Sequence, residues 1–185
     1  MLRTLPQTRD WTLAQRLAGV IAFALVTAVS ARISIPMEPV PFTFQPLAVL
    51  LAGMILGARD GMASQLLYVL MIAGGLPVDS RALGPAALLG PTAGYIYGFV
   101  PAAFVVGWIA QQRQSVFWVR LIAGIAGIVV IYVFGLSWLM ATRTLDFNAA
   151  WLAGGAAFIL PDLVKAVIAA TLTQGGRLLW DQRPL

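Results

Sequence analysis

Two opposite charges interrupt an apolar segment near the C-terminal end of the chain. Asp162 and Lys165 lie three residues apart in AFILPDLVKAVIAA, residues 157–170. On a helix this spacing puts both side chains on one face. A charge at the centre of a membrane helix costs about 2.5–3.5 kcal/mol on insertion scales, so such residues usually face the bundle interior and serve a function. The pair therefore predicts a binding site for a small polar ligand; an ion pair that only fixes helix packing is the alternative.

The amino-acid composition is that of an integral membrane protein. Of the 185 residues, 60% are hydrophobic and 10% are charged, whereas soluble domains have about 45–50% apolar and about 25% charged residues. The mean hydropathy is +0.87. The absence of Cys and His excludes disulfides, Cys/His metal sites and acid–base catalysis by imidazole. The net charge of +5 comes from basic residues that are scattered singly, so we expect a lipid bilayer and no nucleic acid as a partner.

Six apolar windows predict the fold. A transmembrane helix needs about 20 apolar residues. Polar residues, Pro or Gly separate windows at 16–34, 44–58, 61–76, 90–111, 116–140 and 149–173. The second and third windows are short, which indicates tilted helices or irregular chain that completes the crossing. We expect an all-α integral membrane protein in which residues 1–185 form a single six-transmembrane-helix bundle.

The distribution of basic residues predicts the orientation of the bundle. With the N-terminus inside, the cytoplasmic side receives eight arginines, which are Arg3, Arg9, Arg16, Arg59, Arg113, Arg120, Arg177 and Arg183. The outer side receives three, which are Arg32, Arg81 and Arg143. This imbalance predicts that both termini are cytoplasmic, in a multi-pass protein of the bacterial inner membrane. The alternative, a signal peptide cleaved near AVSA at residues 28–31, is disfavoured by the five apolar segments that follow.

The first outer connection is proline-rich and ends with two polar side chains. It reads ISIPMEPVPFTFQP, residues 33–46. Proline prevents helix formation and biases the preceding residue toward extended backbone, so the segment predicts a stiff wall or lid. Thr43 and Gln45 are candidates to face a cavity. The alternative is an ordinary loop that caps helix ends.

The second outer connection, residues 74–99, is rich in glycine and proline. Irregular backbone is tolerated near a membrane only where it is buried in protein or lines a cavity. We therefore expect this connection to face a ligand. Its polar tip consists of Asp79, Ser80 and Arg81, of which Ser80 and Arg81 are candidate binding residues.

The helix that follows this connection contributes two more candidates. Thr92 stands where the helix begins, and the positive end of the helix dipole favours an anionic ligand group there. Tyr95 and Tyr97 point in different directions on a helix, so at most one faces a given pocket, and Tyr95 is the candidate. Anchoring at the membrane interface is the alternative for either tyrosine.

Small residues on the first predicted helix indicate close helix packing. Ala24 and Ala28 lie four residues apart on one face, where they let a second helix approach closely. That second helix could belong to another protein or to the same bundle.

Four motifs together resemble the BioY family, the biotin-binding S components of energy-coupling factor (ECF) vitamin transporters. In chain order, over about residues 24–170, they are ISIPMEPVPFTFQ, LGARDGMASQLLYVLMIAGGLPV, LLGPTAGYIYGF and LPDLVKAVIAA. The resemblance implies a six-helix bundle that binds biotin from the outside as a transported substrate and uses no cofactor. It also implies that an ECF coupling transmembrane protein and ATPase subunits are partners.

The resemblance further implies roles for individual residues. Asp162 and Lys165 become pocket residues, the two outer connections become walls and lid, and Ala24 and Ala28 become contacts with the coupling protein. The chain departs from the family pattern after GLPV, where it reads DSRALGPAALL, and in GPTAGY in place of GPTGGY. The polar tip of the second connection would then replace an amide contact of the family, or the substrate would be a close relative of biotin.

Competing functions come from other classes of membrane protein. An intramembrane protease needs Ser with His, or two Asp within its spans, whereas this chain has no His and places only Asp162 in such a position. We therefore expect no enzyme. A solitary biotin carrier, or an S component for another small vitamin-like solute, remains an alternative, and the chain carries no phosphate-binding loop of its own.

Overall fold

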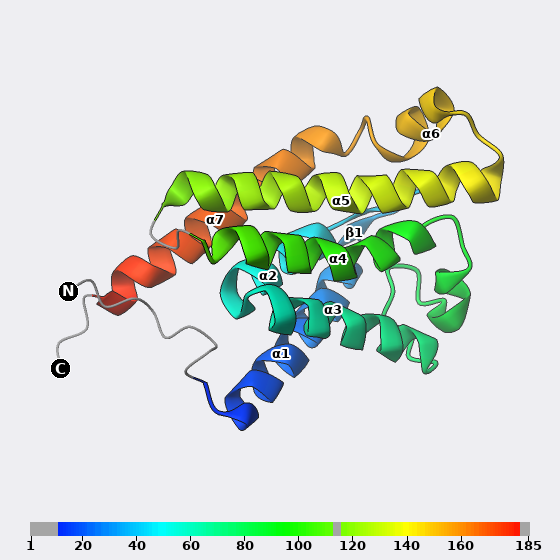
Figure 1. Ribbon diagram of the computed structural model, residues 1–185. Coiled ribbons are helices and arrows are strands. Elements are labelled where there is room, and N and C mark those ends of the chain that lie inside the picture. Colours follow the sequence, from blue (N-terminus) through cyan, green and yellow to red (C-terminus); the bar gives the residue numbers. More distant parts are fainter. Residues whose placement is uncertain (1–10, 113–115, 182–185) are drawn as a thin grey trace.

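The protein folds into a bundle of helices with one small β-hairpin (Figure 1). The computed structural model describes residues 11–112 and 116–181. In chain order the elements are α1 (Leu13–Arg32), β1 (Ser34–Ile35), β2 (Phe42–Thr43), α2 (Gln45–Leu56), α3 (Ala58–Ala73), the 3₁₀ helix η2 (Gly84–Leu88), α4 (Ala93–Ala110), α5 (Phe117–Arg143), α6 (Phe147–Gly154) and α7 (Ile159–Asp181). The predicted all-α class is confirmed.

Several helices have the length and apolar character of membrane spans. Among the described residues, α1, α4 and α5 are each long and apolar enough to cross a membrane, and the pair of α6 and α7, bent by 56°, has the length and apolar character of one broken span or of a re-entrant loop. The helices α2 and α3 have 12 and 16 residues, so the second and third predicted spans are short in the structure as well. The chain is a multi-pass membrane protein, whereas the count of six spans stays a prediction.

The predicted orientation depends in part on residues outside the described part of the chain. Arg3, Arg9, Arg113 and Arg183 lie outside it, and so does the side chain of Arg177. The cytoplasmic position of both termini therefore stays a prediction.

The last predicted span, 149–173, is broken into α6 and α7 at residues 155–158, which corrects the expectation of one continuous helix. In a continuous helix the ring of Pro161 would clash with the backbone carbonyl of residue 157, and its missing N–H would remove a hydrogen bond. In the structure Pro161 stands in the first turn of α7, where that N–H has no helical partner to lose. The charged pair therefore lies at the beginning of a helix, beside a break, and not in the middle of a continuous helix.

The helix α4 lies against α2, α3 and α5, and its glycines allow close contact. Figure 1 shows α4 and α5 side by side over much of their length. A Cβ atom added at Gly94 would lie 2.2 Å from Cβ of Trp138 on α5, and one added at Gly107 would lie 2.3 Å from the backbone nitrogen of Ala58 on α3. The absence of side chains at these two positions thus sets how α4 packs, which in turn fixes the residues at its N-terminal end.

The helix α1 is attached to α3 by polar contacts at two points. The Arg16 guanidinium donates two hydrogen bonds to the Asp60 carboxylate, at 2.7 and 2.9 Å. Further along, the Thr27 hydroxyl lies 3.2 Å from the side-chain amide of Gln65, with both side chains fully buried. Buried polar groups that satisfy one another across two membrane helices fix their relative position.

Candidate ligand-binding site

A cavity lies between the β-hairpin and the helices α4, α5 and α7. Its volume is about 60 Å³, which is below the range of about 300–1,000 Å³ for small-molecule sites, so the walls must move apart before a ligand of that size fits. The walls are mostly apolar and aromatic, with a few polar groups. The lining residues are Val40, Pro41, Phe42, Thr43, Gln45, Pro46, Ser80, Thr92, Tyr95, Ile96, Phe99, Ile131, Tyr132, Gly154, Phe158, Asp162 and Lys165.

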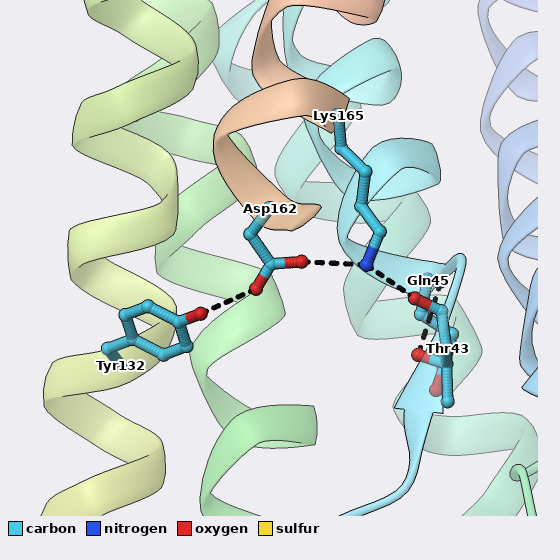
Figure 2. A network of polar contacts seen from close by, with 5 residues as sticks. All are labelled: Thr43, Gln45, Tyr132, Asp162 and Lys165. Atoms are coloured by element: carbon cyan, nitrogen blue, oxygen red, sulfur yellow. Dashed lines mark hydrogen bonds and ion pairs between the residues drawn. The ribbon is translucent and has the colours of Figure 1, made fainter. Parts of the chain in front are cut away.

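The centre of the polar wall is an ion pair on α7 (Figure 2). The Lys165 ammonium donates to Asp162 Oδ1 at 2.7 Å and to the backbone carbonyl of Thr43 at 2.7 Å. The other carboxylate oxygen, Oδ2, accepts a hydrogen bond from the Tyr132 hydroxyl at 2.7 Å. Asp162 and Lys165 are each 4% exposed, so both charges are satisfied within the protein.

The break before α7 places these two charges at the cavity. Asp162 lies in the first turn of α7, and its carboxylate is favoured there by the positive end of the helix dipole. Its backbone N–H donates to the carbonyl of Phe158 at 2.9 Å, which continues the helical bonding into the break. Lys165 follows on the same face, so the ammonium reaches the hairpin on the opposite wall.

The β-hairpin contributes the second wall. Strands β1 and β2 pair antiparallel, and the ring of Phe42 lies under the Lys165 ammonium, with Nζ 4.1 Å from the ring centroid. A cation in that position is attracted by the electrons of the ring. The Thr43 hydroxyl accepts from the backbone N–H of Gln45 at 3.3 Å, which stabilises the turn into α2.

Gln45 connects the cavity to the second outer connection. Its side-chain amide donates to the hydroxyl of Tyr68 on α3 at 2.7 Å, and that hydroxyl donates to the backbone carbonyl of Val78 at 3.3 Å. Gln45 is 5% exposed and Tyr68 is fully buried. The polar groups of the site therefore extend in one chain of hydrogen bonds to the base of the loop that carries Ser80.

Tyr95 and Tyr97 have different surroundings. Tyr95 lines the cavity and donates to the backbone carbonyl of Gly154 at 2.9 Å. Its ring fits against two glycines, since a Cβ added at Gly135 or Gly154 would lie 2.3 or 2.2 Å from atoms of Tyr95. Tyr97 instead donates to the carbonyl of Leu88 at 2.8 Å and is not among the lining residues of the cavity.

Ser80 and Thr92, two further predicted residues, line the cavity, whereas Arg81 does not. Arg81 donates to the carbonyls of Pro39 and Met37, at 3.0 and 3.3 Å, and lies 3.2 Å from the Glu38 carboxylate. Arg81 thus connects the second outer connection to the first.

The same loop is stabilised at two other points. The Asp79 carboxylate, 2% exposed, accepts the backbone N–H groups of Arg81 and Gly84 at 3.0 and 2.8 Å. Arg32, at the end of α1, donates to the carbonyl of Pro77. These contacts fix the shape of the loop that presents Ser80 to the cavity.

Ala24 and Ala28 lie inside the bundle. They are 0% and 8% exposed, on the helix α1 that packs against α3. The structure therefore shows the packing use of these small residues. Contact with a partner protein stays a prediction, and it requires this face of α1 to become accessible.

Several lining residues were not predicted from the sequence, and Tyr132 is the most important of them. It is a tyrosine in the apolar helix α5, and a phenol in a membrane helix needs a hydrogen-bond partner. That signal identifies Tyr132 as a polar group of the interior, although it does not identify Asp162 as the acceptor. Phe42, Phe99 and Phe158 look like ordinary core residues in the sequence.

The groups that line the cavity are suited to binding a ligand by hydrogen bonds and apolar contacts. The cavity presents a carboxylate acceptor, an ammonium donor and hydroxyl groups, set in apolar and aromatic walls that suit a compact ligand with N–H and carbonyl groups. Among the described residues, no group of three or more Asp and Glu side chains could hold a metal ion.

Comparison with known proteins places the chain in a family. The BioY family matches residues 4–182. The biotin transporter BioY of Thermotoga maritima is 40% identical over 151 residues, which cover 81% of this chain and 88% of that protein. The biotin transporter BioY of Rhizobium etli is 39% identical over an alignment of 190 positions, which covers 96% of each chain.

A solved structure shares the fold. The crystal structure of the S-component for biotin from an ECF-type ABC transporter matches with a TM-score of 0.81 at 22% sequence identity, over 89% of this chain and 92% of that one. Because the family match extends over nearly the whole sequence and the relatives are aligned along most of their length, the chain belongs to the BioY family.

Proposed function

We propose that this chain binds biotin in the cavity and takes part in biotin uptake as the substrate-binding component of an ECF-type transporter. The observation that carries the proposal is the buried Asp162–Lys165 pair in the cavity wall of a BioY family member. Charged residues inside a membrane protein commonly mark the path or site of a ligand. The biotin transporters at 39–40% identity support biotin as that ligand.

The chemistry of biotin fits the lining of the cavity. Its ureido group offers N–H donors and a carbonyl acceptor, its bicycle is compact and apolar, and its tail ends in a carboxylate. Asp162 would accept a ureido N–H, and Lys165 would donate to the ureido carbonyl or pair with the tail carboxylate. The rings of Phe42, Phe99 and Phe158 would cover the bicycle, because they line the same cavity.

The proposal includes partners and a membrane topology. An ECF coupling transmembrane protein and ATPase subunits would supply the energy for uptake. Six spans would cross the bacterial cell membrane with both termini in the cytoplasm, supported by the excess of arginine on one side of the predicted topology. The fold shared with an ECF S-component supports this assembly.

Uptake of radiolabelled biotin tests the proposal. The gene would be expressed in a bacterial strain that lacks its own biotin transporters, with and without the genes for a coupling protein and its ATPases. We expect rapid uptake at nanomolar biotin only when both parts are present. An excess of unlabelled biotin should abolish the signal, while other vitamins should not.

Each alternative has its own outcome in the same experiment. Equal uptake without the coupling protein and ATPases would show a solitary carrier. No uptake of labelled biotin, together with uptake of a different labelled vitamin by the same strain, would show an S component for another solute. No uptake of biotin under either condition, with the protein present in the membrane, would contradict the proposal.

A further inference from the structure

The second hydrogen bond to Asp162 comes from a different helix. Lys165 approaches Oδ1 from the same helix, α7, whereas Tyr132 on α5 approaches Oδ2 (Figure 2). Both bonds are 2.7 Å long. Donors on both oxygens fix the plane of the carboxylate, so its remaining lone pairs have fixed directions.

The hydroxyl of Tyr132 is committed to this carboxylate. A phenol has one hydrogen to donate, and here it goes to Asp162. The ring of Tyr132 packs edge-on against Trp151, with centroids 6.3 Å apart, and its side chain is largely buried. Tyr95, which lines the same cavity, donates to the carbonyl of Gly154 and does not take the place of Tyr132.

The two donors to Asp162 differ in what else they can do. Lys165 has three N–H groups and already divides them between Asp162 and the Thr43 carbonyl. A ligand with a carbonyl or carboxylate group would draw the ammonium further away from Asp162. Tyr132 can make no such exchange, because its single hydrogen is held by the carboxylate.

We propose that Tyr132 is a positioning residue that acts through Asp162. It holds the carboxylate in place as a charged acceptor for ligand N–H groups while Lys165 turns toward the ligand. The inference rests on the proposed function, since biotin is the ligand used to test it. A hydrogen bond to a charged group is stronger than one between neutral groups. Loss of the Tyr132 bond should therefore lower the affinity for the ligand, because the Asp162 carboxylate would no longer be held in position.

Calorimetric titration of the purified protein with biotin tests the inference. The variant is Tyr132→Phe, which removes one oxygen and keeps the ring. The matched control is Tyr97→Phe, which removes a hydroxyl bound to the Leu88 carbonyl, away from the cavity. We expect affinity to fall about 10- to 100-fold in Tyr132→Phe, the range for a lost bond to a charged group, and to stay within about twofold in the control.

A double-mutant cycle separates positioning from a merely structural role. In the Asp162→Asn background, Tyr132→Phe should change the affinity by less than about threefold, because the charged acceptor is gone. Weak binding would be measured by displacement of radiolabelled biotin at high ligand concentration. An affinity of Tyr132→Phe within twofold of wild type, or an equal loss in both backgrounds, would overturn the inference.

Infrared spectroscopy gives a readout that does not depend on biotin binding. The bands that disappear in Asp162→Asn identify its carboxylate, and we expect them to shift in Tyr132→Phe and not in Tyr97→Phe. Unchanged carboxylate bands in Tyr132→Phe would also overturn the inference. A wild-type protein that failed to bind biotin would contradict the proposed function alone, while the infrared comparison would still decide the role of Tyr132.

Discussion

The Lys165 ammonium lies 2.7 Å from Asp162 Oδ1, so the two charges of the cavity neutralise each other. The same nitrogen lies 2.7 Å from the Thr43 carbonyl, which ties α7 to the β-hairpin. Both charged side chains are almost completely buried. A ligand that enters this site must therefore compete with polar groups that are already paired. The hydrogen bonds of the Lys165 ammonium must break, or the ammonium must donate to the ligand as well, when the ligand binds.

Removing one partner of the ion pair should destabilise the protein more than removing both charges. Loss of one partner from a buried pair commonly costs about 3–5 kcal/mol, because the other charge is left uncompensated. We expect Asp162→Asn and Lys165→Met each to lower the melting temperature, and the double variant to recover part of the loss. Thermal unfolding in detergent gives the melting temperatures of wild type, the two single variants and the double variant. Equal melting temperatures for all four proteins would contradict a buried, coupled pair.

Loss of the Arg81 contacts should release bound biotin faster. Arg81 joins the second outer connection to Met37, Glu38 and Pro39 of the first. Each hydrogen bond contributes about 0.5–1.5 kcal/mol, and the exposed ion pair adds little, so we expect Arg81→Gln to raise the dissociation rate about 5- to 20-fold.

The dissociation rate is measured by adding excess unlabelled biotin to the protein with radiolabelled biotin bound and following the loss of bound label. Arg143→Gln is the matched control, since Arg143 is an exposed arginine at the end of α5. A dissociation rate equal to wild type in Arg81→Gln would show that the contact between the two loops does not retain the ligand.

The sequence predicts the charged pair and the proline-rich segment that faces it, because both depend on local patterns. The spacing of Asp162 and Lys165 determines that they share a helix face, and the prolines around Thr43 and Gln45 prevent a helix there. The shared face holds in the structure, and Thr43 lies in strand β2, whereas Gln45 is already the first residue of helix α2. All four residues line one cavity. Apolar windows likewise predict helices, since the bilayer requires them.

Features that depend on tertiary contacts could not be predicted in this way. The contact of Arg81 with the first loop, and that of Tyr132 with Asp162, join residues about 30 to 40 positions apart and have no local pattern. The break before α7 has a local cause in Pro161, but an apolar window extends across it without a gap. Hydropathy alone therefore predicts one span where the structure has two helices.

Gly154 should be required for the shape of the cavity. A Cβ added there would lie 2.2 Å from the Tyr95 hydroxyl, so Gly154→Ala should displace Tyr95 and weaken biotin binding, by about 10-fold or more if the displacement costs 1.4 kcal/mol. Tyr95→Phe should restore much of the affinity in the Gly154→Ala background, because it removes the clashing oxygen.

Gly175→Ala serves as the control for that series. A Cβ added at Gly175 meets no atom of the described part of the chain within 4 Å, so affinity should match that of wild type. Normal binding by Gly154→Ala, or failure of Tyr95→Phe to restore any binding, would contradict the role given to the contact between Tyr95 and Gly154.

Calorimetric titration of two purified, folded proteins shows whether the cavity around Asp162 and Lys165 binds biotin. The first is wild type, and the second is Asp162→Asn/Lys165→Met, which keeps the volume of both side chains close to the original without their charges. We expect saturable, tight binding of one biotin to wild type and at least about a 100-fold loss in the double variant, equivalent to about 2.7 kcal/mol. Equal biotin affinity of the two proteins, or no binding by folded wild type, would contradict biotin binding in this cavity.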